Sequence, residues 1–367
     1  MIASLIALAV RQRWAVLFFF LIVAGLGVWQ LTKLPIDAVP DITNKQVQIN
    51  TVDPRLSPVE IEKLVTYPVE ISLAGIPGLE TTRSISRNGF SQVTAIFTDS
   101  TELYFARQQV GERLRQATEN LPDGVHPHIS PMTTGLGEVV MYTVGYKNPD
   151  GKGAKKVAGQ PGWQPDGSYL TAEGDLLTDE IAKAGYLRTV QDWIISPQLK
   201  AVSGVAGVDS IGGYAKTFVV EPDPTRLTSF GISYSELGEA LEKANLAVGA
   251  NYYNRAGEAY LVRVDARVRS VDEIRNAVVA TRGCVPITVG QIANVRIGGD
   301  LRTGAGSMNG EDAVIGTELM LIGENSRTVA QDVSAKLNEV SKTLPPGVEV
   351  KIVLDRASLV NATVGTV

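Results

Sequence analysis

The sequence predicts an α+β protein with one membrane-spanning helix near its N-terminal end. Three observations predict this class: a single long apolar run, helix-start signals that alternate with strand-like segments, and a strand–helix–strand unit that occurs twice. A chain of 367 residues has room for about two or three domains of ordinary size.

The apolar run covers residues 14–31, WAVLFFFLIVAGLGVWQL, with Gln30 as its one strongly polar side chain. At about 1.5 Å a residue, a helix of this length nearly crosses the hydrocarbon core of a bilayer. The alternative is a cleaved signal peptide. We expect an uncleaved anchor, because the run exceeds an apolar signal region of roughly 7–15 residues and no small-residue cleavage site follows.

The charges around this run predict its orientation. Two arginines, Arg11 and Arg13, precede it, whereas one lysine and two aspartates follow closely. The positive-inside rule then places the N-terminus in the cytoplasm and the chain after about residue 32 outside it. We expect residues 2–10 to form a short interfacial helix.

Helix-start signals are frequent in the rest of the chain. Ser57-Pro-Val-Glu60 has the pattern of a capping box with proline at the first helical position. Segments 233–236 and 270–273 repeat the Ser-x-x-Glu spacing. Strand-like segments alternate with these starts, at residues 92–97, 139–144, 218–221, 260–264 and 348–354.

One unit occurs twice. Strand 93–97 leads through a polar turn into a helix that ends in Leu-Pro-Asp-Gly-Val at 121–125. Strand 318–322 leads into a helix that ends in Leu-Pro-Pro-Gly-Val at 344–348. Each unit is half of a split βαβ, ferredoxin-like module, so we expect two such modules.

Two other segments interrupt this plan. Residues 146–178 are rich in Gly, Lys, Asp and Pro and lack periodicity, so we expect an exposed insertion there. Residues 192–279 have their own helix and strand signals, with a hairpin expected at Gly212-Gly213. We expect them to form an α/β unit inserted into the second module.

Several motifs resemble those of the resistance-nodulation-division (RND) efflux transporters. Leu-Pro-Ile-Asp-Ala-Val-Pro-Asp-Ile at 34–42 follows the apolar run as in that family, and residues 60–80 are similar to its first porter helix. Residues 187–199, 204–213 and 134–138 are similar to its heavy-metal branch, the cobalt–zinc–cadmium and copper–silver exporters, rather than to its multidrug branch.

This resemblance covers nearly the whole chain and implies a domain plan. The plan is an interfacial segment and transmembrane helix at 1–32, a first porter sub-domain at 33–134, a second porter sub-domain at 135–190 and 280–356, a docking sub-domain at 191–279, and the start of a second transmembrane helix at 357–367.

The resemblance also implies a function. The chain would be the N-terminal portion of the inner-membrane subunit of a proton-driven, tripartite pump for heavy-metal cations such as zinc, cobalt or cadmium. Its partners would be two further copies in a homotrimer, a periplasmic adaptor (membrane fusion) protein and an outer-membrane channel, in a bacterial inner membrane. The alternatives are a truncated, membrane-anchored periplasmic interaction module that transports nothing, and a multidrug RND pump.

Three residues are candidate metal ligands. Glu138 lies in a Gly-Leu-Gly-Glu-Val stretch and resembles a carboxylate that acts as a metal ligand near this position in some zinc pumps of the family. A carboxylate suits a divalent ion. The alternative is a glutamate that faces solvent at the start of a strand. His126 and His128, with Asp123 nearby, would share a face of a strand; the alternative is a loop with incidental histidines.

Composition argues against other classes. The net charge is −5 and no long basic block occurs, so we do not expect nucleic acid as a partner. Cys284 is the only cysteine, which rules out an internal disulfide or a cysteine zinc cluster. The scattered methionines do not favour copper or silver. No nucleophile triad or phosphate-binding motif occurs, so we expect no enzyme and no tightly bound cofactor besides the transported cation.

Overall fold

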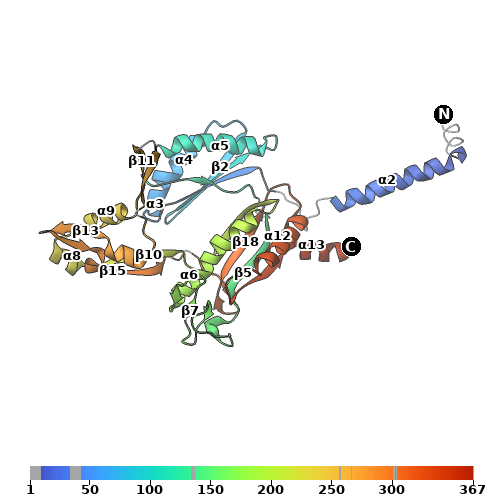
Figure 1. Cartoon of the computed structure of the whole chain (residues 1–367). Coiled ribbons are helices and arrows are strands. Elements are labelled where there is room, and N and C mark those ends of the chain that lie inside the picture. The colour runs from blue at the N-terminus through green and yellow to red at the C-terminus, as the bar shows by residue number, and fades with distance from the viewer. Residues whose placement is uncertain are drawn as a thin grey trace.

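The computed structural model describes most of the chain (Figure 1). The described residues are 10–33, 43–133, 137–255, 258–265, 267–300, 302 and 304–366. The expected interfacial helix, the 34–42 motif and part of the 134–138 motif lie outside them.

Helix α2 (Arg13–Lys33) stands apart from the α/β body and corresponds to the apolar run (Figure 1). Its window Arg13–Gln30 has a mean hydropathy of 1.7, and none of it is buried within the protein. Its length and composition suffice to cross a membrane. A signal sequence passes the same test, so the choice of an uncleaved anchor stays a prediction.

The first unit, residues 46–129, is a four-stranded sheet under two helical segments. The strands lie in the order β2-β3-β1-β4, with β1 next to β3 and β4. Apolar side chains of the helices and of alternate strand positions form one core, which includes Ile49, Ala95 and Phe97. The elements are β1 (Gln46–Val52), α3 (Pro58–Ile61), η1 (Glu62–Thr66), α4 (Tyr67–Leu73), β2 (Leu79–Arg87), β3 (Phe90–Phe97), α5 (Leu103–Thr118) and β4 (His128–Ile129).

The second unit repeats this plan with its own core. Its strands lie in the order β19-β5-β18-β9, so the first strand again lies between the third and the fourth. Helices α6 and α12 flank the β5–β18 pair in Figure 1 and contribute to the same core. The elements are β5 (Glu138–Tyr146), α6 (Glu180–Val190), η3 (Gln191–Ile195), α7 (Ser196–Lys200), β9 (Val205–Ile211), β18 (Val314–Met320), α12 (Ser326–Val340) and β19 (Val348–Asp355).

The helix-start signals are confirmed at all three places. The backbone N–H of Ser57 donates to Glu60 at 2.9 Å, and that of Ser233 donates to Glu236 at 2.8 Å. At the third start, the Ser270 hydroxyl accepts from the N–H of Glu273 at 3.2 Å. These bonds satisfy backbone donors that would otherwise lack partners in the first helical turn.

A third unit is inserted between β9 and β18 and has a separate core around Leu227, Ile287 and Ile292. Its outer strands β10 and β15 pair with each other along their whole length. The elements are β10 (Lys216–Pro222), α8 (Pro224–Phe230), α9 (Tyr234–Ala244), β11 (Ala247–Arg255), β12 (Glu258–Asp265), α10 (Val271–Asn276), β13 (Val278–Arg282), β14 (Val285–Thr288), α11 (Val289–Ile292) and β15 (Ala293–Gly299).

The hairpin expected at Gly212-Gly213 is wrong. Strand β9 pairs with β18 and strand β10 pairs with β15, so the two glycines carry the chain from one sheet to another. Both have positive φ, which explains why they resemble a hairpin turn. The same pairings place residues 205–211 in the second unit, so the inserted unit begins after the two glycines rather than at residue 191. It also extends beyond the expected end at residue 279, because β15 pairs with β10 and Ile287 and Ile292 belong to its core.

The segment 146–178 is also more ordered than an exposed loop. It contains a short turn η2 (Pro149–Gly151) and a small sheet of β6 (Gly162–Trp163), β7 (Tyr169–Leu170) and β8 (Leu176–Leu177). Trp163 and Tyr169 are 3% and 0% exposed and belong to the second core. Their apolar rings anchor a segment whose remaining residues are mostly turn formers.

The chain continues past β19 as helix α13 (Arg356–Thr366). Two short strands, β16 (Ser307–Met308) and β17 (Glu311–Asp312), form a hairpin just before β18. Whether α13 begins a second membrane span stays a prediction.

Candidate functional site

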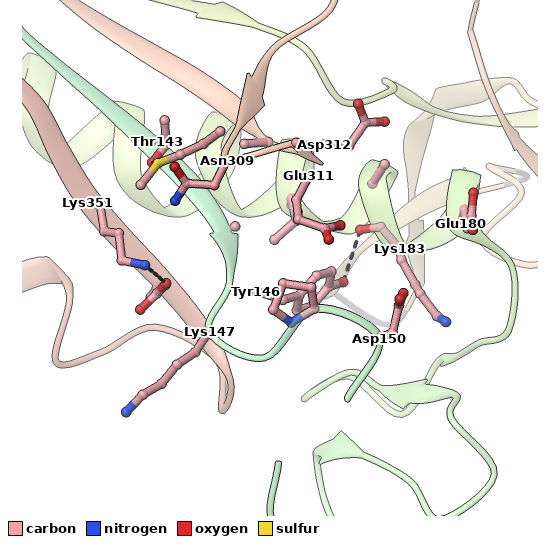
Figure 2. A pocket seen from close by; sticks show the side chains of 18 of the residues that line it. Thr143, Tyr146, Lys147, Asp150, Glu180, Lys183, Asn309, Glu311, Asp312 and Lys351 are labelled. Carbon is pink, nitrogen blue, oxygen red and sulfur yellow. Dashed lines mark hydrogen bonds and ion pairs between the residues drawn. The ribbon is translucent and has the colours of Figure 1, made fainter. Parts of the chain in front are cut away.

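A cavity of about 510 Å³ lies in the second unit (Figure 2). Strand β5, helix α6, the 146–178 segment, the β16–β17 hairpin and strand β19 line it. This is the volume range of pockets that bind small molecules. Residues distant in the sequence reach it, among them Tyr146, Trp163, Lys183 and Glu311.

Aromatic rings form one wall of this cavity and continue into the core. The ring centroid of Tyr146 lies 5.2 Å from that of Trp163 and 5.0 Å from that of Tyr169. The Tyr146 hydroxyl donates to the backbone oxygen of Lys183 at 3.0 Å, as the dashed line in Figure 2 shows. Burial raises the pKa of Tyr146 well above its usual range, so its phenol stays protonated.

Lys183 and Asp312, two charged residues at the cavity, each have interaction partners. The ammonium group of Lys183 lies 5.2 Å from the centroid of the Trp163 ring and donates to the oxygen of Gly167 at 3.1 Å. Asp312 accepts two hydrogen bonds from the Arg302 guanidinium, both at 3.1 Å. The cavity wall thus combines aromatic, carboxylate and ammonium groups.

The three predicted metal ligands lie on two different units. His128 is in the short strand β4 opposite Asn50, whereas His126 precedes that strand. The expectation that both histidines lie on one face of a strand is therefore wrong. Glu138 begins β5 in the second unit, opposite Leu319. All three side chains are exposed.

Over the described ranges, no three His, Cys, Asp or Glu side chains lie together as a group that could hold a metal ion. The cavity and the predicted ligands therefore do not make a complete metal centre within this part of the protein. The ligand roles of Glu138, His126 and His128 stay predictions.

Sequence reasoning missed two buried polar residues, Glu318 and Gln191. Each is 0% exposed, in β18 and η3 of the second unit. The internal repeat held a signal for Glu318, because aligning the two Leu-Pro-x-Gly-Val ends, 121–125 with 344–348, matches Glu318 to the apolar Ala95. A glutamate at an apolar position of a repeated strand is a candidate for a special role.

A model of the AcrB/AcrD/AcrF family matches residues 5–367. The chain therefore belongs to this family, the RND transporters, as its motifs predict. Its relatives are heavy-metal efflux proteins, which agrees with the branch assigned from residues 187–213.

Two curated relatives match over the full 367 residues. The nickel-cobalt-cadmium resistance protein NccA of Alcaligenes xylosoxydans xylosoxydans is 62% identical, and the nickel and cobalt resistance protein CnrA of Cupriavidus metallidurans is 60% identical. The alignments cover 100% of this chain and 34% of each relative. The chain thus spans about a third of the length of these relatives.

A solved structure has the same fold. An X-ray structure of a heavy metal efflux pump matches with a TM-score of 0.81 and 30% identity, over 99% of this chain and 33% of that chain. The mixed helix and strand architecture is therefore that of a heavy-metal RND pump over the matched third.

Proposed function

We propose that this chain is the N-terminal portion of the inner-membrane subunit of a tripartite, proton-driven pump that exports divalent metal cations. The observation that carries the proposal is the 62% identity to a nickel-cobalt-cadmium resistance protein over every residue of the chain. Nickel and cobalt, which the names of both relatives share, become the first metals to test. Cadmium and zinc come next, and no enzymatic reaction is assigned.

The proposal includes the arrangement of the parts. Helix α2 would anchor the chain with its N-terminus in the cytoplasm and the body in the periplasm. The first and second units would be ferredoxin-like porter sub-domains, since each has β-α-β-β-α-β connectivity. The inserted unit would be the docking sub-domain, and the complete protein would form a homotrimer with an adaptor and an outer-membrane channel.

The test is metal tolerance in a bacterium that carries the full-length gene. Deletion should lower tolerance to nickel and cobalt, and the restored gene should return it. Unchanged metal tolerance with increased sensitivity to a dye would favour a multidrug pump and contradict the proposal. A topology reporter at Gly151 that is active in the cytosol would contradict the orientation.

Within this proposal Glu138 is a metal ligand on the transport path. Glu138→Gln in the full-length gene should lower the tolerated nickel or cobalt concentration several-fold, because an amide replaces an anionic ligand. The matched control is Glu80→Gln, an exposed strand glutamate of the first unit, which should keep wild-type tolerance. Wild-type tolerance in both variants would remove Glu138 from the path.

A further inference from the structure

Glu318 lies in the middle of β18 and faces the core beneath the α6–η3–α7 helix. On that face its neighbours across the sheet are Val140 of β5 and Val208 of β9. The side chain is 0% exposed, so water does not reach the carboxyl group.

No donor in the described structure reaches this carboxyl group. Both of its oxygens lack a hydrogen-bond partner, and so does the Oε1 atom of Gln191. The Gln191 amide nitrogen donates to the Tyr142 hydroxyl at 3.0 Å and to the Ser210 hydroxyl at 3.2 Å. These bonds occupy the nitrogen and leave the amide oxygen as an acceptor that needs a donor.

Gln191 is held over the position next to Glu318 on the same face of β18. Tyr142 and Ser210, which hold Gln191, pair with Gly316 from its two sides. Glu318 is the next residue on the same face of β18, because residues two apart in a strand point to the same side. A carboxylic acid at Glu318 has one O–H to donate, and Gln191 has one oxygen to accept it; a carboxylate has nothing to offer.

The charges around Glu318 do not compensate for its burial. Lys200 at the end of α7 lowers its pKa, whereas Asp209 on β9 raises it, and Tyr142 on β5 carries a neutral phenol. The negative charge of Asp192 of η3, like that of Glu318, raises the pKa of Tyr142. Burial is the largest effect and raises the pKa of Glu318 from 4.5 to about 8.

The first unit shows that the fold does not require an acid here. The position in the first unit that corresponds to Glu318 is Ala95 of β3. Each residue precedes the N-cap of the next helix, Glu102 or Asn325, by the same number of residues. Ala95 is 0% exposed and packs in an apolar core. The acid is therefore a specific feature of the second unit, not a consequence of the topology.

We propose that Glu318 is a proton-binding site inside the second unit, held as a neutral acid that donates to Gln191. Loss of this proton leaves an unsolvated carboxylate between the sheet and the α6–η3–α7 helix, and loosens their packing. This site does not depend on the proposed transport function and holds whether or not the chain exports metal.

The direction of the pH effect follows from linkage. Because the pKa of Glu318 is higher in the folded protein than in the unfolded chain, folding takes up a proton between the two values. The stabilisation is complete below about pH 4.5 and is lost as the pH rises towards about 8.

The first experiment is infrared spectroscopy of the full chain in detergent at neutral pH. Exposed carboxyl groups are then ionised, so the carbonyl stretch of a protonated acid should report on Glu318. The band should disappear in Glu318→Gln, persist in the exposed control Glu339→Gln on α12, and titrate away near pH 8. A band that is absent at neutral pH, or unchanged in Glu318→Gln, overturns the proposal.

Two further measurements test the hydrogen bond from Glu318 to Gln191 and the effect of the Glu318 proton on the packing of the second unit. Gln191→Leu should shift the carbonyl band, since the acid loses its acceptor; an unshifted band would exclude Gln191 as the partner. Amide exchange in β18 and α6, corrected for the intrinsic effect of pH, should increase as the pH rises from about 4.5 to about 8 in the wild type but not in Glu318→Gln. Equal pH dependence in both would show that the proton does not control the packing.

Discussion

The first and second units have the same strand order, but they treat buried polar groups differently. In the first unit, the Thr66 hydroxyl is hydrogen-bonded to those of Ser86 and Ser91, at 2.8 and 2.7 Å. In the second unit, Glu318 and Gln191 leave three buried oxygens unpaired. Across the described residues, all buried side-chain nitrogens and oxygens without a partner belong to the second unit.

The two units also share a local irregularity with a common cause. The helix between the first two strands of each unit contains one wide turn, η1 or η3, where the backbone forms a π-helix. A proline follows each turn, Pro68 in the first unit and Pro197 in the second. Proline lacks the N–H of a regular helix and crowds the preceding turn, which accounts for the widening.

The comparison teaches that connectivity and core content are separable. Turn signals, caps and alternating apolar positions are common to both units and suffice for the shared topology. The content of the core then differs at single positions, such as Ala95 against Glu318. A distinct property of one unit should therefore be removable without loss of the fold.

The largest expected effect is the loss of the apolar core in the first unit. Phe97→Ala removes a ring that is 1% exposed and should destabilise this unit by about 3–5 kcal/mol. Amide hydrogen exchange in β1 and β3 measures the effect locally, since a chain with several units need not unfold in one step.

The control for Phe97 is Phe105→Ala on α5, a ring that is 41% exposed and should matter far less. If Phe97→Ala accelerated exchange equally in β5 and β18, the two units would not be independent, and the comparison would fail.

A smaller effect is expected from crowding in the second unit. An added Cβ at Gly316 would clash with the Tyr142 ring, so Gly316→Ala should cost about 1–3 kcal/mol. In the first unit the corresponding residue is Val93, opposite the smaller Ile49. The lack of a side chain at Gly316 thus leaves room for the ring of Tyr142, whose hydroxyl accepts a hydrogen bond from Gln191.

Gly145→Ala is the matched control, because an added Cβ there meets nothing within 4 Å. It should change stability by no more than about 0.5 kcal/mol. Exchange rates in β5 and β18 distinguish the two variants, and equal rates would show that the sheet shifts to accept a Cβ at Gly316.

The sequence predicts some of these features better than others. The apolar run, the capping boxes and the repeated unit depend on local patterns, and each corresponds to a described element. The course of the chain after Gly212-Gly213 was mispredicted, because two glycines with positive φ suit a hairpin and a change of sheet equally. Only long-range pairing distinguishes the two.

Buried residues with polar atoms were the hardest to predict. Trp163 and Tyr169 lie in a stretch of turn formers without periodicity, so their burial depends on contacts with β5 and α6. A lone glutamate in a strand is ordinarily exposed, and the burial of Glu318 follows only from its place between two neighbouring strands. The cavity beside Tyr146 likewise combines five separate segments.

The smallest expected effect is a loss of stability of the first unit at acid pH. Protonation of its carboxyl group destabilises that unit, whereas protonation of Glu318 stabilises the second. In the first unit, Asp53 is 4% exposed and accepts from the Arg55 side chain through both oxygens, each at 2.8 Å. These hydrogen bonds hold the pKa of Asp53 below its usual value. A carboxyl group with a lowered pKa stabilises the fold at neutral pH, and this contribution is lost as the pH falls through the folded-state value.

Asp53→Asn should therefore weaken the first unit near neutral pH and flatten its acid dependence, while the second unit keeps its loss of stability as the pH rises towards about 8. Asp99→Asn, at an exposed aspartate of the same unit, is the control and should leave the acid dependence unchanged. Amide exchange in β1 and in β18 across the pH range separates the two behaviours. Parallel pH profiles in the two strands would mean that Asp53 and Glu318 do not act on their units separately, because their protonation should shift stability in opposite directions.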